Sequence, residues 1–190
     1  MQEMNQTVLR WEGPFSFSPS ADRPCILGAV SAEGPGVYLW ALPVDGRYLV
    51  NYVGITAGSV AARQDEHVRL YLSGKYTIYN PKDFAQARKT RLFDPLDGLA
   101  AFLSRYVEIS QALAEYLKMI HVFFAPLKVE KVLLERIESA LIEAIRNAGG
   151  PAATFLDNAR ISRWTPPERK VPISIMQSPV FDGVPDELRV

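Results

Sequence analysis

The chain has 190 residues and a mass of 21.2 kDa, which suits one domain with an elaboration or at most two very small domains. Apolar residues make up 48% of it, so disorder is excluded for most of the chain. Basic and acidic side chains number 21 each, and the resulting net charge of zero excludes a purely electrostatic nucleic-acid binder of the histone kind. A single cysteine, Cys25, excludes an internal disulfide and a multi-thiolate zinc site. No apolar stretch reaches the roughly 18 residues of a membrane span, so we expect a cytoplasmic protein without a membrane partner.

The first half of the chain predicts a hairpin followed by a helix. Residues 1–30 mix turn formers with short apolar runs, and we expect an extended N-terminal lead-in. Two β-rich runs follow, Gly36–Leu42 and Tyr48–Ile55, and the Asp45-Gly46 pair between them is a strong hairpin signal. A helix is predicted from Ser59, its N-cap, to Leu72.

The second half predicts two helices around one strand. Residues 73–93 are polar and basic and predict a loop, and Asp94-Pro95 then favours the start of a long helix to about Lys118. The short apolar run Met119–Ala125 predicts a strand, and Val129–Asn147 a second strong helix. The last 26 residues contain five prolines and predict extended chain with little regular structure.

Together these elements predict an α+β fold. Its centre is a small antiparallel sheet of three strands flanked by helices, in a domain spanning residues 31–160. A helical insert occupies about 73–118, and an extended proline-rich tail occupies 161–190.

One carboxylate is turned toward the core on the helix from Val129. At 100° per residue the apolar stripe includes Ile137, Leu141 and Ile145, and Glu138 lies at its edge. A carboxylate in that position is costly unless it is paired or coordinates a metal. The alternative to a functional role is a structural salt bridge.

Two cationic or polar side chains lie on the apolar face of the helix from Ser59. Arg63 and His67 are one turn apart, and such a pair attracts carboxylate or phosphate groups. The alternative is that Arg63 and Glu138 form a buried, purely structural ion pair. In that case the protein would have a role unrelated to nucleic acid.

The order of these residues resembles the GIY-YIG nuclease family. The matching features are Gly36-Val37-Tyr38, Tyr52-Val53-Gly54, Arg63-x-x-x-His67, Glu138 and Asn158. Valine replaces isoleucine in both triplets, which is a conservative change in a strand. Two spacings depart from compact family members, because the gap between His67 and Glu138 and the loop between the triplets are both longer.

The resemblance implies a metal-dependent endonuclease that hydrolyses phosphodiester bonds and leaves 5′-phosphate and 3′-hydroxyl ends. One Mg²⁺ or Mn²⁺ ion would be bound, with Glu138 as its only protein ligand. Tyr38 would take a proton from the attacking water, directly or in a relay with Tyr52. Arg63 would stabilise charge on the phosphoryl oxygens.

The two remaining matched residues have supporting roles in this comparison. His67 would hydrogen-bond to Tyr38 or to substrate, and Asn158 would support the site. The resemblance favours DNA over RNA as the partner. A catalytically silent nucleic-acid-binding module on the same scaffold is the alternative function.

Two basic segments flank the matched residues and could follow a phosphate backbone. A solvated surface is the alternative for both. The candidate nucleic-acid-binding side chains are Lys75, Lys82, Arg88, Lys89, Arg91, Arg160 and Arg163.

The two tyrosines constrain the hairpin. A two-residue Asp45-Gly46 turn without a compensating bulge would place Tyr38 and Tyr52 on opposite faces of the sheet, because side chains alternate along a strand. A shared site requires them on one face, which a loop with an odd number of residues provides. We therefore predict such a loop, with Gly46 at positive φ and both tyrosines facing the proposed site.

Overall fold

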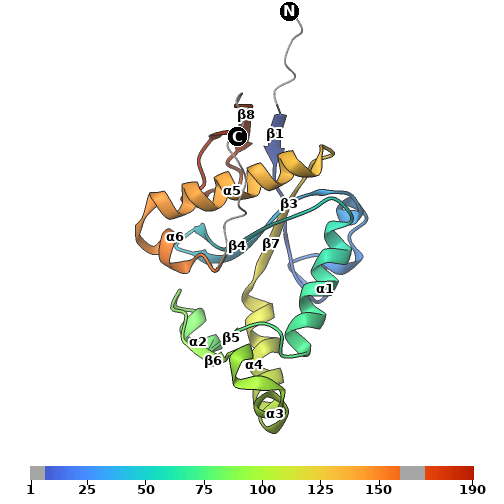
Figure 1. Cartoon of the computed structure of the whole chain (residues 1–190), viewed down its shortest axis with the longest axis vertical. Helices are drawn as coiled ribbons and strands as arrows, with labels where there is room; N and C mark the ends of the chain where they lie inside the picture. The colour runs from blue at the N-terminus through green and yellow to red at the C-terminus, as the bar shows by residue number, and fades with distance from the viewer. Residues whose placement is uncertain (1–6, 159–169) are drawn as a thin grey trace, which may run out of the picture.

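A five-stranded sheet lies at the centre of the molecule (Figure 1), in the order β2-β7-β3-β4-β9. This computed structural model describes residues 7–158 and 170–190. The strands are β2 (Glu12–Phe15), β3 (Gly36–Val44), β4 (Arg47–Thr56), β7 (His121–Pro126) and β9 (Phe181–Asp182). The hairpin strands and the strand predicted at 119–125 are antiparallel neighbours in this sheet, which confirms the three central strands of the predicted α+β fold.

Two helices pack against β3 and β4. α1 (Val60–Leu72) begins as predicted, since the Ser59 side chain accepts a hydrogen bond from the amide of Ala62. α5 (Lys131–Ala148) buries the predicted aliphatic stripe and ends at Gly149, which has a φ of 71°. Figure 1 shows α5 crossing the sheet at one end and α1 running beside it, with the short α6 (Gly150–Phe155) after α5.

The hairpin turn differs from the prediction, but the tyrosines still share a face. Val44 pairs with Arg47, so the loop holds two residues, and the predicted odd loop is wrong. Gly46 has the predicted positive φ, 76°. The register then shifts: Ala41 opposes Val50 but Trp40 opposes Tyr52, which makes Asn51 an extra residue in β4. This bulge reverses the alternation of side chains beyond it and places Tyr52 on the same face as Tyr38.

The insert forms a separate layer below the sheet in Figure 1. The predicted loop over 73–93 contains short elements: β5 (Ile78–Tyr79), α2 (Pro81–Phe84) and β6 (Arg91–Phe93). The predicted single helix from 94 to 118 is wrong, because it is divided into the 3₁₀ turn η3 (Pro95–Asp97), α3 (Gly98–Ser104) and α4 (Tyr106–Met119). The break lies at Arg105, where φ is −113° and ψ is 16°, and Phe102 in α3 and Ile109 in α4 are both buried.

The predicted lead-in and tail contain regular structure. β1 (Thr7–Arg10), β8 (Pro172–Met176) and β10 (Glu187–Arg189) form a second sheet, and β2 and β9 extend the central one at its two edges. Two short 3₁₀ turns, η1 (Ile26–Gly28) and η2 (Val30–Glu33), precede β3. Pairing between residues far apart in the sequence creates these short strands, so local composition does not reveal them. Within the described residues, no helix combines the length and the apolar character needed to cross a membrane.

Candidate active site

Each of the two matched triplets contains a glycine, Gly36 or Gly54, at a position where another group lies too close for a side chain. The ring of Tyr38 lies directly on Gly54, where a Cβ would be 2.4 Å from the Tyr38 Cζ and Oη atoms. A Cβ at Gly36 would be 2.4 Å from the carbonyl oxygen of Ala125 in the neighbouring strand. Gly54 therefore allows the Tyr38 ring to lie against β4, and Gly36 allows β3 to approach β7 closely.

Tyr38 forms a hydrogen bond with His67 inside the protein. Its hydroxyl lies 2.8 Å from Nε2 of His67, and the two residues are only 1% and 2% exposed. Burial, and to a smaller extent the Arg63 guanidinium, lower the pKa of His67 to about 4, so this imidazole is neutral at pH 7. Burial raises the pKa of Tyr38 well above its ordinary value, and the nearby Tyr52 adds to this effect while Arg63 opposes it. Tyr38 is therefore a neutral phenol at pH 7.

Tyr52, the tyrosine of the second matched triplet, lies beside Tyr38. The rings of Tyr38 and Tyr52 have their centroids 6.1 Å apart, and burial raises the pKa of Tyr52 to about 12. The Trp40 ring lies 5.5 Å from the Tyr52 ring and 5.2 Å from the His67 ring, centroid to centroid, and its indole nitrogen donates to Oε1 of Gln64 at 2.7 Å. Neither Trp40 nor Gln64 was predicted from the sequence. Trp40 could have been found from its position two residues after Tyr38, which puts both on one face of the strand.

Arg63 lies at the border between this cluster and solvent. Its side chain is 33% exposed and pairs with Glu66, one turn along α1. Burial lowers its pKa, but the hydrogen bond to Glu66 and the interaction with Tyr38 outweigh this and raise the pKa above its ordinary value. No ion pair joins Arg63 to Glu138 among the described residues, so the structure does not form the alternative salt bridge.

Glu138 reaches the same place from α5. Burial, and to a smaller extent the neighbouring Glu135, raise the pKa of its carboxyl to about 7, while Arg63 opposes both effects. Its charge also raises the pKa values of Tyr38 and Tyr52, which shows that it lies near both. Glu138 has no hydrogen-bond or ion-pair partner among residues 7–158 and 170–190. It is the half-buried carboxylate that the helical pattern predicted.

Asn158 holds the strand that carries Tyr52. Its side-chain amide accepts from the amide of Val53 at 2.9 Å and donates to the carbonyl of Val53 at 2.7 Å, as a paired strand would. Asn158 therefore bonds to the backbone of β4 next to Tyr52, and its predicted supporting role stays a prediction.

The bulge in β4 is anchored by parts of the chain far away in sequence. The buried Asn51 side chain donates to the carbonyl of Phe155 at 3.1 Å and accepts from the hydroxyl of Tyr116 at 3.3 Å. Its own carbonyl accepts from the amide of Asp157 at 2.6 Å. α4 and the segment after α6 thus stabilise the register that brings Tyr38 and Tyr52 together.

Several of the predicted basic residues are already paired. Arg88 pairs with Asp83, Lys89 with Asp157 and Arg91 with Asp94. These partners neutralise much of the charge that the segment carries in the sequence.

The other candidate basic residues divide into two groups. Lys75 and Lys82 have no ion pair within the described part of the chain, and only Lys75 lies beside the cluster, at a cavity described next. Arg160 and Arg163 lie outside the described residues.

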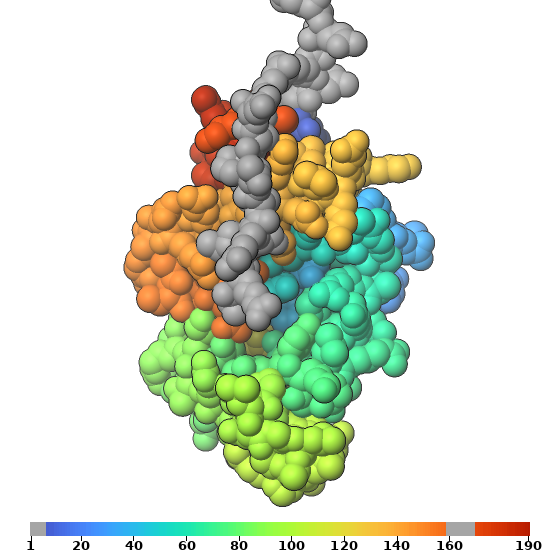
Figure 2. Space-filling view, viewed as in Figure 1, coloured from blue at the N-terminus to red at the C-terminus, as the bar shows by residue number. Residues whose placement is uncertain are grey.

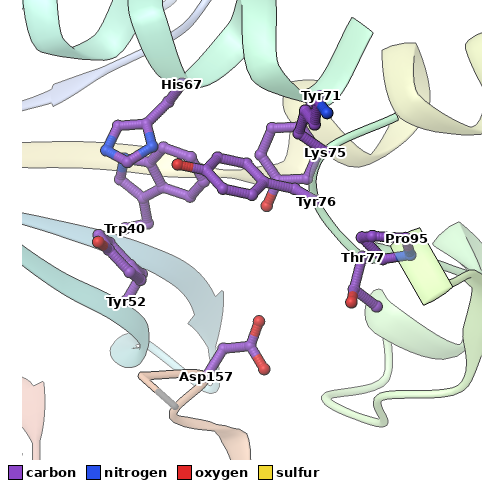
Figure 3. A pocket seen from close by; sticks show the side chains of 9 residues that line it. All are labelled: Trp40, Tyr52, His67, Tyr71, Lys75, Tyr76, Thr77, Pro95 and Asp157. Carbon is purple, nitrogen blue, oxygen red and sulfur yellow. The ribbon is translucent and has the colours of Figure 1, made fainter. Parts of the chain in front are cut away.

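A cavity of about 280 Å³ opens beside the cluster. Aromatic side chains dominate its lining (Figure 3): Trp40, Tyr52, His67, Tyr71 and Tyr76. In the space-filling view the surface is hollowed between α1 and the α5–α6 region, above the insert (Figure 2). Tyr52 and His67 belong both to this cavity and to the cluster around Tyr38.

The described residues contain no group of three or more His, Cys, Asp or Glu side chains arranged to hold a metal ion. Comparisons with protein-family models, with curated proteins and with solved structures found no match to this chain.

Proposed function

We propose that the protein is a metal-dependent endonuclease that hydrolyses phosphodiester bonds in nucleic acid at the cluster around Tyr38. One observation carries this proposal: two strands and two helices bring the matched residues to one place. Those residues are Tyr38, Tyr52, Arg63, His67 and Glu138. Their order along the chain is that of the GIY-YIG family, and this resemblance favours DNA as the substrate.

The chemistry of Glu138 fits a divalent cation. A half-buried carboxylate with a raised pKa and no partner among the described residues is stabilised as an anion when a cation binds it. Mg²⁺ needs few protein ligands, because it retains several waters and takes substrate phosphate oxygens. When bound, the ion would polarise the phosphoryl group and stabilise the leaving oxygen.

Tyr38 and His67 are arranged to move one proton. As a neutral phenol, Tyr38 can accept a proton from the attacking water only if it releases its own. The neutral Nε2 of His67, 2.8 Å away, is the acceptor within reach. A bound phosphate would favour this transfer, because its negative charge stabilises the imidazolium.

Arg63 supplies the positive charge on the open side of the cluster. One of its nitrogens bonds to Glu66, and the guanidinium has other N–H donors that can bind phosphoryl oxygens. Its partial exposure fits a group that meets a substrate arriving from solvent.

The test is a cleavage assay on DNA and RNA substrates. Plasmid, single-stranded DNA and structured RNA would be incubated with the protein in Mg²⁺, in Mn²⁺ and in chelator, and the product ends would be mapped. We expect metal-dependent cleavage that leaves 5′-phosphate and 3′-hydroxyl ends. Binding without cleavage of any substrate would favour the silent nucleic-acid-binding module, and neither binding nor cleavage would overturn both functions.

A further inference from the structure

The cavity beside Tyr38 is built from aromatic rings. Trp40 and Tyr71 are 2% and 6% exposed and form its floor, while Tyr52 and Tyr76 are more exposed and form its sides. Figure 3 shows Tyr52 and Tyr76 on different sides of the opening, and they belong to β4 and to the segment after α1. A small cavity lined by partly exposed aromatic rings from two elements suits a flat aromatic guest.

Polar groups are placed around the rim of this aromatic cavity. The carboxylate of Asp157 is held by the hydroxyl of Tyr79 at 2.5 Å and by Lys89 at 3.4 Å, and Figure 3 shows it directed toward the opening. Lys75 and Thr77 line the cavity from the insert, and within the described residues neither the Lys75 ammonium nor the Thr77 hydroxyl has a hydrogen-bond partner. The rim thus offers an acceptor, a hydroxyl and a cation around an aromatic interior.

We propose that this cavity takes one unpaired nucleobase of the substrate, next to the phosphate that is hydrolysed. The base would stack between Tyr52 and Tyr76, and the hydrogen-bonding groups on its edge would meet Asp157 and Thr77. Lys75 would bind a neighbouring phosphate. This inference rests on the proposed nuclease function and specifies its substrate: a single strand, or a duplex with a looped-out nucleotide.

The size of the cavity limits its guest. About 280 Å³ is slightly smaller than the roughly 300–1,000 Å³ of typical ligand pockets, so one ring system fits and a base pair does not. A base in a regular duplex is stacked on both sides and cannot enter without leaving the helix. Tyr52 and His67 line the cavity and also contact Tyr38. A guest in the cavity would therefore be separated from Tyr38 by a single side chain, which fits a nucleotide adjoining the reacting phosphate.

The test compares Tyr76→Ala with a matched control, Tyr106→Ala. Tyr106 is a half-exposed tyrosine of the same insert that lies outside the cavity. Both changes would be made in the Glu138→Gln background, and binding would be followed in chelator by fluorescence anisotropy. The probes are a labelled short single strand, the same strand carrying one abasic site at successive positions, its perfect duplex, and a duplex with one looped-out nucleotide. Cleavage of the same four probes by the chain with Glu138 intact would be measured in parallel.

We expect the single strand and the looped-out duplex to bind at least about tenfold more tightly than the perfect duplex. Tyr76→Ala should remove about tenfold of that affinity, and Tyr106→Ala should remove none. An abasic site beside the cleavage position should weaken binding to the parent but not to Tyr76→Ala.

The outcomes separate this inference from the nuclease proposal. Cleavage of the perfect duplex at the rate of the single strand, with Tyr76→Ala binding as the parent does, would overturn the unpaired base and leave the nuclease function standing. Binding that depends on Tyr76 without any cleavage would support the base site and refute catalysis. An absence of both binding and cleavage would overturn both.

Discussion

Gly54→Ala tests how the hairpin holds Tyr38. The new Cβ would lie 2.4 Å from Cζ of the Tyr38 ring, whereas ordinary contact begins at 3.4 Å, so the ring must move by about 1 Å. Overpacking of this kind costs about 1–3 kcal/mol in the free energy of unfolding. The shift should also disturb the 2.8 Å hydrogen bond to His67, and under the proposed mechanism we expect a displacement of this size to slow cleavage about 10²-fold.

The stability change can be measured by urea unfolding, independently of activity. Gly58→Ala is the matched control, because its Cβ would meet only the Thr56 hydroxyl oxygen at 3.7 Å. In a Tyr38→Ala background the clash is absent, so Gly54→Ala should then cost almost nothing. The reasoning is refuted if Gly54→Ala is as mild as Gly58→Ala, or if its cost is unchanged once the Tyr38 ring is removed.

Three further predictions concern the residues around this tyrosine. Because the folded-state pKa of Glu138, about 7, lies above its ordinary 4.5, the folded protein loses stability as the pH rises between these values. Metal-free Glu138→Gln should therefore gain roughly 1–3 kcal/mol over wild type across that range in urea unfolding; a constant difference would contradict a raised pKa. Arg63→Ala should slow cleavage by about 10²-fold or more in single-turnover assays and leave the fold intact, whereas Arg69→Ala on the same helix should not slow it; an unfolded Arg63→Ala would point to a structural role. Asn158→Ala leaves the backbone amide and carbonyl of Val53 unpaired and should lower the free energy of unfolding in urea by about 2–4 kcal/mol. Replacing the exposed Asn147 by Ala should not change it, and equal costs for the two variants would refute the contribution of the Asn158 hydrogen bonds.

The elements that depend on local signals could be predicted from the sequence. The hairpin strands, the Ser59 cap, the strand at 119–125 and the helix with Glu138 at the edge of its stripe all follow from periodicity and turn chemistry. The inward placement of His67 follows in the same way, since helical spacing puts it on the buried face of α1.

The register of the hairpin could not be predicted, because distant residues determine it. Asp45-Gly46 forms the two-residue turn that such a pair favours. The bulge at Asn51 then shifts the pairing of β3 and β4 by one residue, which puts Tyr38 and Tyr52 on the same face. That bulge is bonded to Tyr116 and Phe155, which are 65 and 104 positions away in sequence. No local pattern in β4 carries this information.

The net charge of the insert surface could not be predicted from composition either, because it depends on ion pairs with residues outside the segment. The segment from 73 to 93 is strongly basic in sequence, yet Lys89 pairs with Asp157 and Arg91 with Asp94, both outside it. The aromatic cavity was missed for the same reason, since Trp40, Tyr52 and Tyr76 come from separate elements.

We propose that Glu138 anchors a metal-dependent hydrolytic site, and this is best tested by the single-turnover cleavage rate in Mg²⁺. Wild type, Glu138→Gln and the matched control Glu143→Gln would be compared; Glu143 is an exposed carboxylate of the same helix. We predict that wild type and Glu143→Gln cleave at equal rates, and that Glu138→Gln is inactive while its urea unfolding shows a folded protein. Metal-dependent cleavage by Glu138→Gln at the wild-type rate would contradict the claim.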